Sequence, residues 1–216
     1  MSNRIALFAS GEEVEKFTGF QLDHASFFQP RYNIAPDQLV DVICESNNEI
    51  IMARARWGIP DESTDLVRPV VDIDEALTGL GKETFARCIV PVSGYYKWKR
   101  NGRRSEYPFF IRMLDEPVMA LAAVITGSPG AGGNLERCAI IQSGSNALVQ
   151  PLDPEMPLQL NKKLASLWLD PKNDPETVTE EARKLFLMTD MTVLRVSKRV
   201  NDLSENSPEL IQPLPK

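Results

Sequence analysis

A strong hairpin signal near the middle of the chain constrains the fold more than any other sequence feature. Asn101-Gly102 lies between two strand-like runs, residues 95–99 and 107–113. Asn-Gly suits the tight turn of a β-hairpin, because both residues adopt positive φ angles at little cost. We therefore expect an antiparallel hairpin at this position.

A second strand shows the alternation of a half-buried sheet. Residues 51–57 place Ile51, Ala53, Ala55 and Trp57 on one face and Met52, Arg54 and Arg56 on the other. A period of two is typical of a strand with one face toward a core. We therefore expect Arg54 and Arg56 to face outward.

Periodicity and capping signals predict the remaining elements. Strands are expected at residues 39–44, 88–91, 118–126, 139–142 and 193–200. Helices are expected at residues 11–20 after a Ser10–Glu13 capping box, at 162–169 after Asn161, and at 175–188 after Asp174-Pro175. Residues 61–84 and 127–134 are interpreted as loops. The sum is one domain, residues 1–216, of the α+β class: mainly antiparallel β with a few flanking helices.

Composition and charge exclude several classes of protein. The 216 residues are 43% apolar, enough for a folded core, and no apolar run reaches the ~18 residues of a membrane span. The N-terminus has no signal-peptide pattern, so a cytoplasmic protein is expected. The net charge of −6 argues mildly against strong nucleic-acid affinity, but it leaves room for a local basic groove.

Cysteine and histidine usage does not indicate a metal or cofactor site. Cys44, Cys88 and Cys138 lie in apolar runs without CxxC spacing, so buried, reduced thiols are expected. His24 is the single histidine, with no His or Cys near it in the sequence. No metal and no cofactor are therefore predicted.

A series of short motifs resembles the SRAP (SOS response-associated peptidase) family. The motifs are Arg31-Tyr32-Asn33-Ile34-Ala35-Pro36, Trp57-Gly58, Arg87-Cys88-Ile89-Val90-Pro91, Gly94-Tyr95-Tyr96-Lys97-Trp98, Pro108-Phe109-Phe110-Ile111, Met156-Pro157, Val196-Ser197, Val200-Asn201 and Leu210-Ile211. Each motif alone is unspecific, whereas their order and spacing together are specific. The resemblance runs the length of the chain and implies the barrel-like fold of that family.

The resemblance also implies a chemistry at the N-terminus. In that family the initiator methionine is removed and residue 2 is cysteine. Its amine and thiol attack the aldehyde of an abasic site in single-stranded DNA, and a thiazolidine ring cross-links protein to DNA. A glutamate, a histidine and an asparagine shape the pocket. The family acts in the response to DNA damage and carries a peptidase label for removal of the residues before the cysteine.

This chain departs from the pattern at the expected catalytic positions. Ser2 replaces the cysteine, Lys97 the glutamate and Asp153 the histidine. Asp72 and Asp74 replace an asparagine and an arginine, although a shifted alignment of that loop also explains these two. If Lys97 and Asp153 face each other, they form an ion pair that fills the pocket. A catalytic Lys97 amine is the alternative, which a neighbouring aspartate disfavours because it stabilises the charged lysine.

Serine is small, so we expect Met1 to be removed, which leaves residue 2 with a free α-amine but without the thiol. The α-amine is partly neutral near neutral pH and can attack an aldehyde to give an imine. A hydroxyl is a weaker nucleophile than a thiol, so the ring should reopen readily. An imine on an abasic sugar also invites β-elimination, which makes a lyase one alternative function. An exposed terminal residue without a role is the other interpretation of Ser2.

The resemblance assigns further positions to contact with DNA. They are Arg4, Asn33, Pro36, Trp57, Gly58, Asp72, Asp74, Trp98 and Gln142. Aromatic side chains stack on bases with little sequence preference, but core packing explains the tryptophans equally well. We predict weak binding of single-stranded or abasic DNA with weakened or absent covalent chemistry. The alternatives are the lyase and a non-catalytic module whose acidic former pocket binds another ligand or a protein partner.

Overall fold

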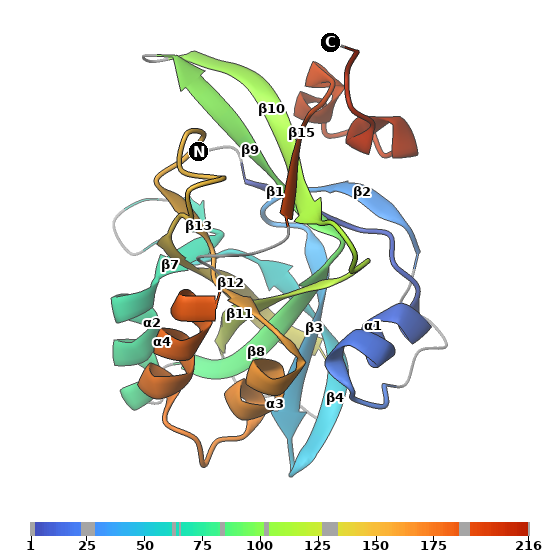
Figure 1. The fold of residues 1–216 in the computed structure, drawn as a ribbon. Helices are drawn as coiled ribbons and strands as arrows, with labels where there is room; N and C mark the ends of the chain where they lie inside the picture. The colour runs from blue at the N-terminus through green and yellow to red at the C-terminus, as the bar shows by residue number, and fades with distance from the viewer. Residues whose placement is uncertain are drawn as a thin grey trace.

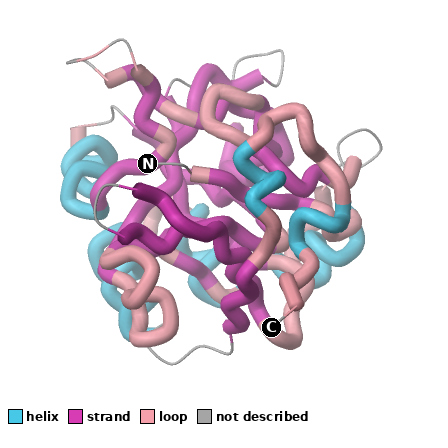
Figure 2. Tube along the Cα trace, turned by 90° about the horizontal axis from the view of Figure 1, so that it is seen from above, coloured by secondary structure: helices cyan, strands magenta, loops and turns pink. Residues whose placement is uncertain are grey.

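Antiparallel β-structure dominates the computed structural model, and the predicted α+β class is confirmed. The structure describes residues 3–22, 29–61, 64, 66–82, 85–101, 104–126, 134–185 and 191–215. Seen from above, strands occupy the centre of the molecule and the helices lie at its periphery (Figure 2).

One sheet closes on itself to form a barrel-like ring. Its main strands are β3 (Leu39–Ser46), β4 (Glu49–Trp57), β8 (Phe85–Val92), β11 (Met119–Thr126) and β12 (Asn134–Gly144). The ring closes because β12 pairs in parallel with β4 and antiparallel with β11. Three shorter strands extend it along β12 and β11: β7 (Val70–Asp72), β13 (Glu155–Pro157) and β14 (Gln159–Leu160).

A second, open sheet carries the predicted hairpin. Its strand order is β15 (Met191–Arg195), β10 (Arg104–Met113), β9 (Gly94–Asn101), β1 (Arg4–Leu7) and β2 (Arg31–Ile34). Strands β9 and β10 project from the rest of the molecule, with β15 beside them (Figure 1). Side chains alternate along a strand, so β9 presents Tyr95 and Lys97 to one face and Tyr96 and Trp98 to the other.

The helices cover the strands. They are α1 (Gly11–Thr18), α2 (Ile73–Gly81), α3 (Lys162–Leu169) and α4 (Pro175–Leu185). Three of them, α1, α3 and α4, begin at the predicted caps. At α1, the Ser10 hydroxyl accepts a hydrogen bond from the Glu13 backbone N–H at 3.2 Å, and the Glu13 carboxylate accepts one from the Ser10 N–H at 2.7 Å. Asn161 caps α3 in the same way, through its side-chain oxygen. These local bonds satisfy N–H groups that a helix start leaves unpaired.

The C-terminal segment packs on the face of the open sheet that holds Trp98. It contains two 3-10 helices, η2 (Lys198–Asn201) and η3 (Pro208–Ile211). The apolar side chains that join segment and sheet are Ala6, Tyr96, Trp98, Phe110, Val196, Val200 and Leu210. Asn33 of β2 anchors the segment, because its Nδ2 donates to the carbonyl oxygens of Val200, Asp202 and Glu205 at 3.2, 2.9 and 3.1 Å.

Two segments differ from the prediction. The predicted loop at 61–84 contains β6 (Val67–Arg68), which pairs with β5 (Ile59–Pro60), followed by β7 and α2. Asp72 caps α2: its Oδ1 accepts from the Asp74 N–H at 2.9 Å. The strand predicted at 193–200 ends at Arg195, and η2 follows. Residues 127–133 of the other predicted loop, Gly102 of the hairpin turn, and His24 lie outside the described residues.

The cysteines are buried and free, as predicted. Burial raises the pKa of Cys44 to about 11 and that of Cys138 to about 12, so both thiols stay neutral near physiological pH. Among the described residues, no helix combines the length and the hydropathy needed to span a membrane.

Gly94 allows β9 to pass close to β10, which positions the residues that follow it. A Cβ at Gly94 would lie 2.6 Å from the Ile111 carbonyl oxygen and would also strike the Phe110 ring. Gly94→Ala should therefore lower the free energy of unfolding by roughly 1–3 kcal/mol, measured by urea denaturation. Gly144→Ala on β12 is the matched control, because a Cβ there meets nothing within 4 Å. Equal effects of the two substitutions would contradict this packing.

Candidate functional site

A small cavity lies at the junction of the open sheet and the closed sheet. It is lined by Asn3, Arg4, Ile5, Trp57, Val70, Tyr95, Tyr96, Lys97, Ile140, Gln142 and Pro157. Its volume is about 20 Å³, which is room for about one water molecule. The structure thus brings together four of the residues singled out from the sequence: Arg4, Trp57, Lys97 and Gln142. Ser2 lies outside the described residues, directly before Asn3 in the chain.

Lys97 and Asp153 form an ion pair at this cavity. Lys97 Nζ donates to Asp153 Oδ2 at 3.2 Å, and the two side chains are only 6% and 17% exposed. Asp153 Oδ1 accepts from the Glu155 N–H at 3.0 Å, which fixes the carboxylate. A half-buried carboxylate stabilises the charged form of the lysine, which has no lone pair to attack with, so the arrangement opposes a nucleophilic Lys97.

Two polar groups at the cavity have no hydrogen-bond partner within the described part of the chain. They are Tyr95 Oη and Arg4 Nε. Burial, with a smaller contribution from the Asp153 charge, raises the pKa of Tyr95, so the phenol stays neutral. Burial lowers the pKa of Arg4, whose Nη1 donates to the Asn3 carbonyl at 2.8 Å. Sequence reasoning did not single out Tyr95, although strand alternation places it on the same face as Lys97.

Trp57 and Trp98 are interior side chains. Trp57 is 1% exposed, and its Nε1 donates to the Pro69 carbonyl at 2.8 Å. Trp98 is 7% exposed, and its Nε1 donates to Asn201 Oδ1 at 2.9 Å. Core packing therefore describes both rings, and stacking on a base would require their neighbours to move. Contact of either tryptophan with DNA stays a prediction.

Asn33 and Gly58 occupy positions with a clear structural cause, and Pro36 and Gln142 are at least half-buried. Asn33 holds the C-terminal segment, and Pro36 is half-buried at the turn after β2. Gly58 has a φ of 120°, which favours glycine, and its N–H donates to the Cys138 carbonyl at 2.7 Å. Gln142 is buried at the cavity wall.

Asp72 and Asp74 lie at the start of α2 and are exposed. Strand β7 brings Asp72 into register with Gln142 of β12, but neither aspartate is among the residues that line the cavity. Carboxylates at a helix N-terminus interact favourably with the helix dipole, which gives these residues a structural role.

The strand arginines face outward, as predicted, and each has an aspartate partner. Arg54 Nε lies 3.3 Å from Asp41 Oδ1, and Arg56 Nη1 lies 3.8 Å from Asp37 Oδ2. Their positive charge is therefore largely balanced within the protein, which weakens their attraction for a phosphate backbone.

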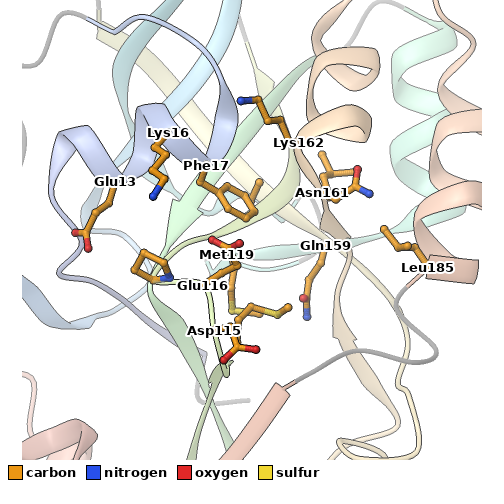
Figure 3. A pocket seen from close by; sticks show the side chains of 14 residues that line it. Glu13, Lys16, Phe17, Asp115, Glu116, Met119, Gln159, Asn161, Lys162 and Leu185 are labelled. Carbon is orange, nitrogen blue, oxygen red and sulfur yellow. The ribbon is translucent and has the colours of Figure 1, made fainter.

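A larger pocket, of about 690 Å³, shares no lining residue with the Lys97 cavity (Figure 3). It is lined by Glu13, Lys16, Phe17, Met113, Asp115, Glu116, Pro117, Met119, Ala120, Gln159, Leu160, Asn161, Lys162 and Leu185. Gln159 Oε1 is buried there without a partner among the residues that the structure describes. None of the residues predicted from the sequence to be functional lines this pocket.

Comparison with known proteins supports the resemblance seen in the sequence. A sequence model of the SOS response associated peptidase (SRAP) family matches residues 1–203. The chain is 28% identical to the abasic site processing protein YoqW of Bacillus subtilis, over 98% of this chain and 99% of that protein. It is 23% identical to the abasic site processing protein YedK of Escherichia coli, over 85% of each.

Solved structures share the fold. A protein from Bacteroides thetaiotaomicron has a TM-score of 0.74 at 19% identity, over 98% of this chain and 99% of that one. A phage-related protein from Bordetella bronchiseptica has a TM-score of 0.69 at 20% identity, over 91% and 94% of the two chains. Because the family's sequence pattern extends over residues 1–203, the chain belongs to the SRAP family.

Proposed function

We propose that this protein binds single-stranded or abasic DNA weakly and does not form the lasting covalent link implied by the family resemblance. The observation that carries the proposal is the Lys97–Asp153 ion pair at a cavity of about 20 Å³. Abasic DNA is the ligand favoured by the names of the relatives, which are abasic site processing proteins.

The ion pair leaves little capacity for proton transfer at the cavity. Ring closure on an aldehyde needs groups that give and take protons at the reacting atoms. Lys97 and Asp153 satisfy each other at 3.2 Å, and Glu155 occupies the second carboxylate oxygen. The cavity volume also excludes a deoxyribose unless these side chains move apart.

Ser2 limits the reaction further. Once Met1 is removed, the Ser2 α-amine and an aldehyde condense to an imine and release water, and hydrolysis reverses the step. Without a thiol, the ring that would stabilise this product closes weakly. A lyase reaction needs a base to remove a proton from the sugar beside the imine. Asp153, held by Lys97, serves poorly as that base, so we favour binding over turnover.

An abasic single-stranded oligonucleotide tests the proposal. Without a reductant, denaturing electrophoresis should separate wild-type protein from DNA completely. Borohydride, which reduces an imine to a stable amine, should trap a minor adduct, and acetylation of the N-terminus should abolish it. An oligonucleotide with a tetrahydrofuran analogue, which has no aldehyde, is the control. An unreduced adduct that survives denaturation would overturn the proposal.

Restoring the family's residues tests the role of the ion pair. Ser2→Cys alone should give little lasting adduct, because the pair still fills the cavity. Ser2→Cys combined with Lys97→Glu and Asp153→His should give several times more, measured as the fraction of DNA shifted on a denaturing gel. If Ser2→Cys alone matches the triple variant, the ion pair does not limit the chemistry.

A double-mutant cycle measures the strength of the pair. Lys97→Met and Asp153→Asn should each lower the free energy of unfolding by about 2–4 kcal/mol, because each substitution removes one member of the ion pair and leaves the other charge poorly solvated. Their coupling energy should be roughly 1–3 kcal/mol.

The exposed pair Lys184–Glu180, at 3.9 Å and with side chains 75% and 60% exposed, is the matched control. Its coupling energy should stay below about 0.5 kcal/mol. Equal coupling in the two cycles would mean that the Lys97–Asp153 pair is solvated like a surface pair.

A further inference from the structure

One face of the projecting hairpin continues outward from the Lys97 cavity. In the register of the open sheet, Lys97 lies opposite Phe109, Phe109 opposite Arg195, and Lys99 opposite Tyr107. Cross-strand partners point to the same side of a sheet. These five side chains therefore share the face of Lys97, which is opposite to the face that holds Trp98.

Tyr107 is the centre of a cationic cluster on this face. The Arg195 guanidinium carbon lies 3.9 Å from the Tyr107 ring centroid, and Lys198 Nζ lies 4.7 Å from it. Arg195, Lys198 and Lys99 are exposed, whereas the Tyr107 side chain is half-buried. Cations over an aromatic ring attract its π-face, which holds the ring in place.

The three cations of this cluster differ from most charged groups near the cavity. In the described structure, no carboxylate lies within ion-pair distance of Arg195, Lys198 or Lys99, whereas Lys97 and Arg54 each have an aspartate partner. In a chain of net charge −6, such a cluster is a local exception. Unpaired, exposed cations are available to phosphate groups without first breaking an internal pair.

Cations combined with a fixed, half-exposed aromatic ring fit single-stranded nucleic acid. Phosphates meet the charges, and a base stacks on the ring or on the guanidinium plane that covers it. An acidic peptide would use the charges but would have no need of the ring. A nucleotide does not fit the small cavity, so a strand that approaches Lys97 must run over the surface beside it.

We infer that the face formed by Lys99, Tyr107, Phe109, Arg195 and Lys198, here called the Tyr107 surface, holds the nucleotides of a single strand that flank the Lys97 cavity. The inference rests on the proposed function, because it names the surface through which the weak DNA binding occurs. It assigns base stacking to Tyr107 in place of the buried Trp57 and Trp98.

The test is binding of the full chain to a fluorescent single-stranded oligothymidine of about ten nucleotides, followed by anisotropy at low salt. Tyr107→Leu should weaken binding about fivefold or more, from the loss of one stacked base. Tyr107→Phe should bind like the wild type. Arg195→Ala and Lys198→Ala should each weaken binding and reduce the slope of log affinity against log salt by about 0.7.

Arg112→Ala is the matched control for the cations. Arg112 lies on the same strand, β10, and is also exposed, but strand alternation places it on the opposite face. Its removal should leave affinity and salt slope unchanged. Thermal melting of each variant shows whether it remains folded. If Tyr107→Leu is unstable, Arg195→Ala and Lys198→Ala still test the surface.

A second oligonucleotide separates stacking from charge. A strand of tetrahydrofuran units has the phosphates but no bases, so Tyr107→Leu should not affect its binding, whereas Arg195→Ala should weaken it. If the Tyr107→Leu and Arg195→Ala variants bind oligothymidine as tightly as the wild type, the assignment of DNA binding to the Tyr107 surface is wrong, and the proposed function still stands. Absence of any wild-type binding at low salt would overturn both. Equal competition by polyglutamate of matched charge would overturn the assignment to nucleic acid.

Discussion

The ion pair between Lys97 and Asp153 is the interaction on which the candidate site depends. Lys97 belongs to β9 of the open sheet, and Asp153 precedes β13, which pairs with the closed sheet. The pair therefore joins the two sheets where the cavity lies. Two charges this poorly exposed are stable only together, because water no longer solvates either one well. Under the proposed function, the same ion pair that supports the junction also keeps both groups from taking part in the reaction.

Strand alternation in β9 separates two kinds of surface. One face holds Tyr95 and Lys97 at the cavity and leads outward to Tyr107. The other face holds Trp98, which the C-terminal segment covers and Asn201 holds by a hydrogen bond. Residues adjacent in one sequence motif thus have opposite environments, since a strand points neighbours to opposite sides. A motif match alone does not reveal which of its residues reach a ligand.

Local signals predicted most of the fold. The Ser10–Glu13 capping box, the Asn161 cap and the alternation in β4 all depend on contacts between near neighbours, and the structure contains each of them. The prediction of a loop at residues 61–84 was wrong because the acidic residues there are typical of loops. Asp72 is instead the N-cap of α2, a helix whose stability depends on the apolar residues that follow. The prediction that the last strand continues to Val200 was wrong. Val200 belongs to a 3-10 helix and packs with Tyr96 and Trp98, which are distant from it in the sequence. The sequence predicted the ion pair only on the condition that Lys97 and Asp153 face each other. Alternation placed Trp57 on the core face, but the choice between core packing and DNA stacking for Trp57 and Trp98 required the tertiary arrangement.

Intact-mass spectrometry of the wild-type protein, after incubation with an abasic single strand and denaturation without reductant, tests the central claim most directly. The account predicts the mass of the free protein alone, because an imine that lacks a stabilising thiol hydrolyses when the complex unfolds. A persistent species with the summed mass of protein and DNA less one water would contradict it. Such a species would mean that an amine beside a hydroxyl, with Lys97 and Asp153 paired nearby, is sufficient for a lasting link.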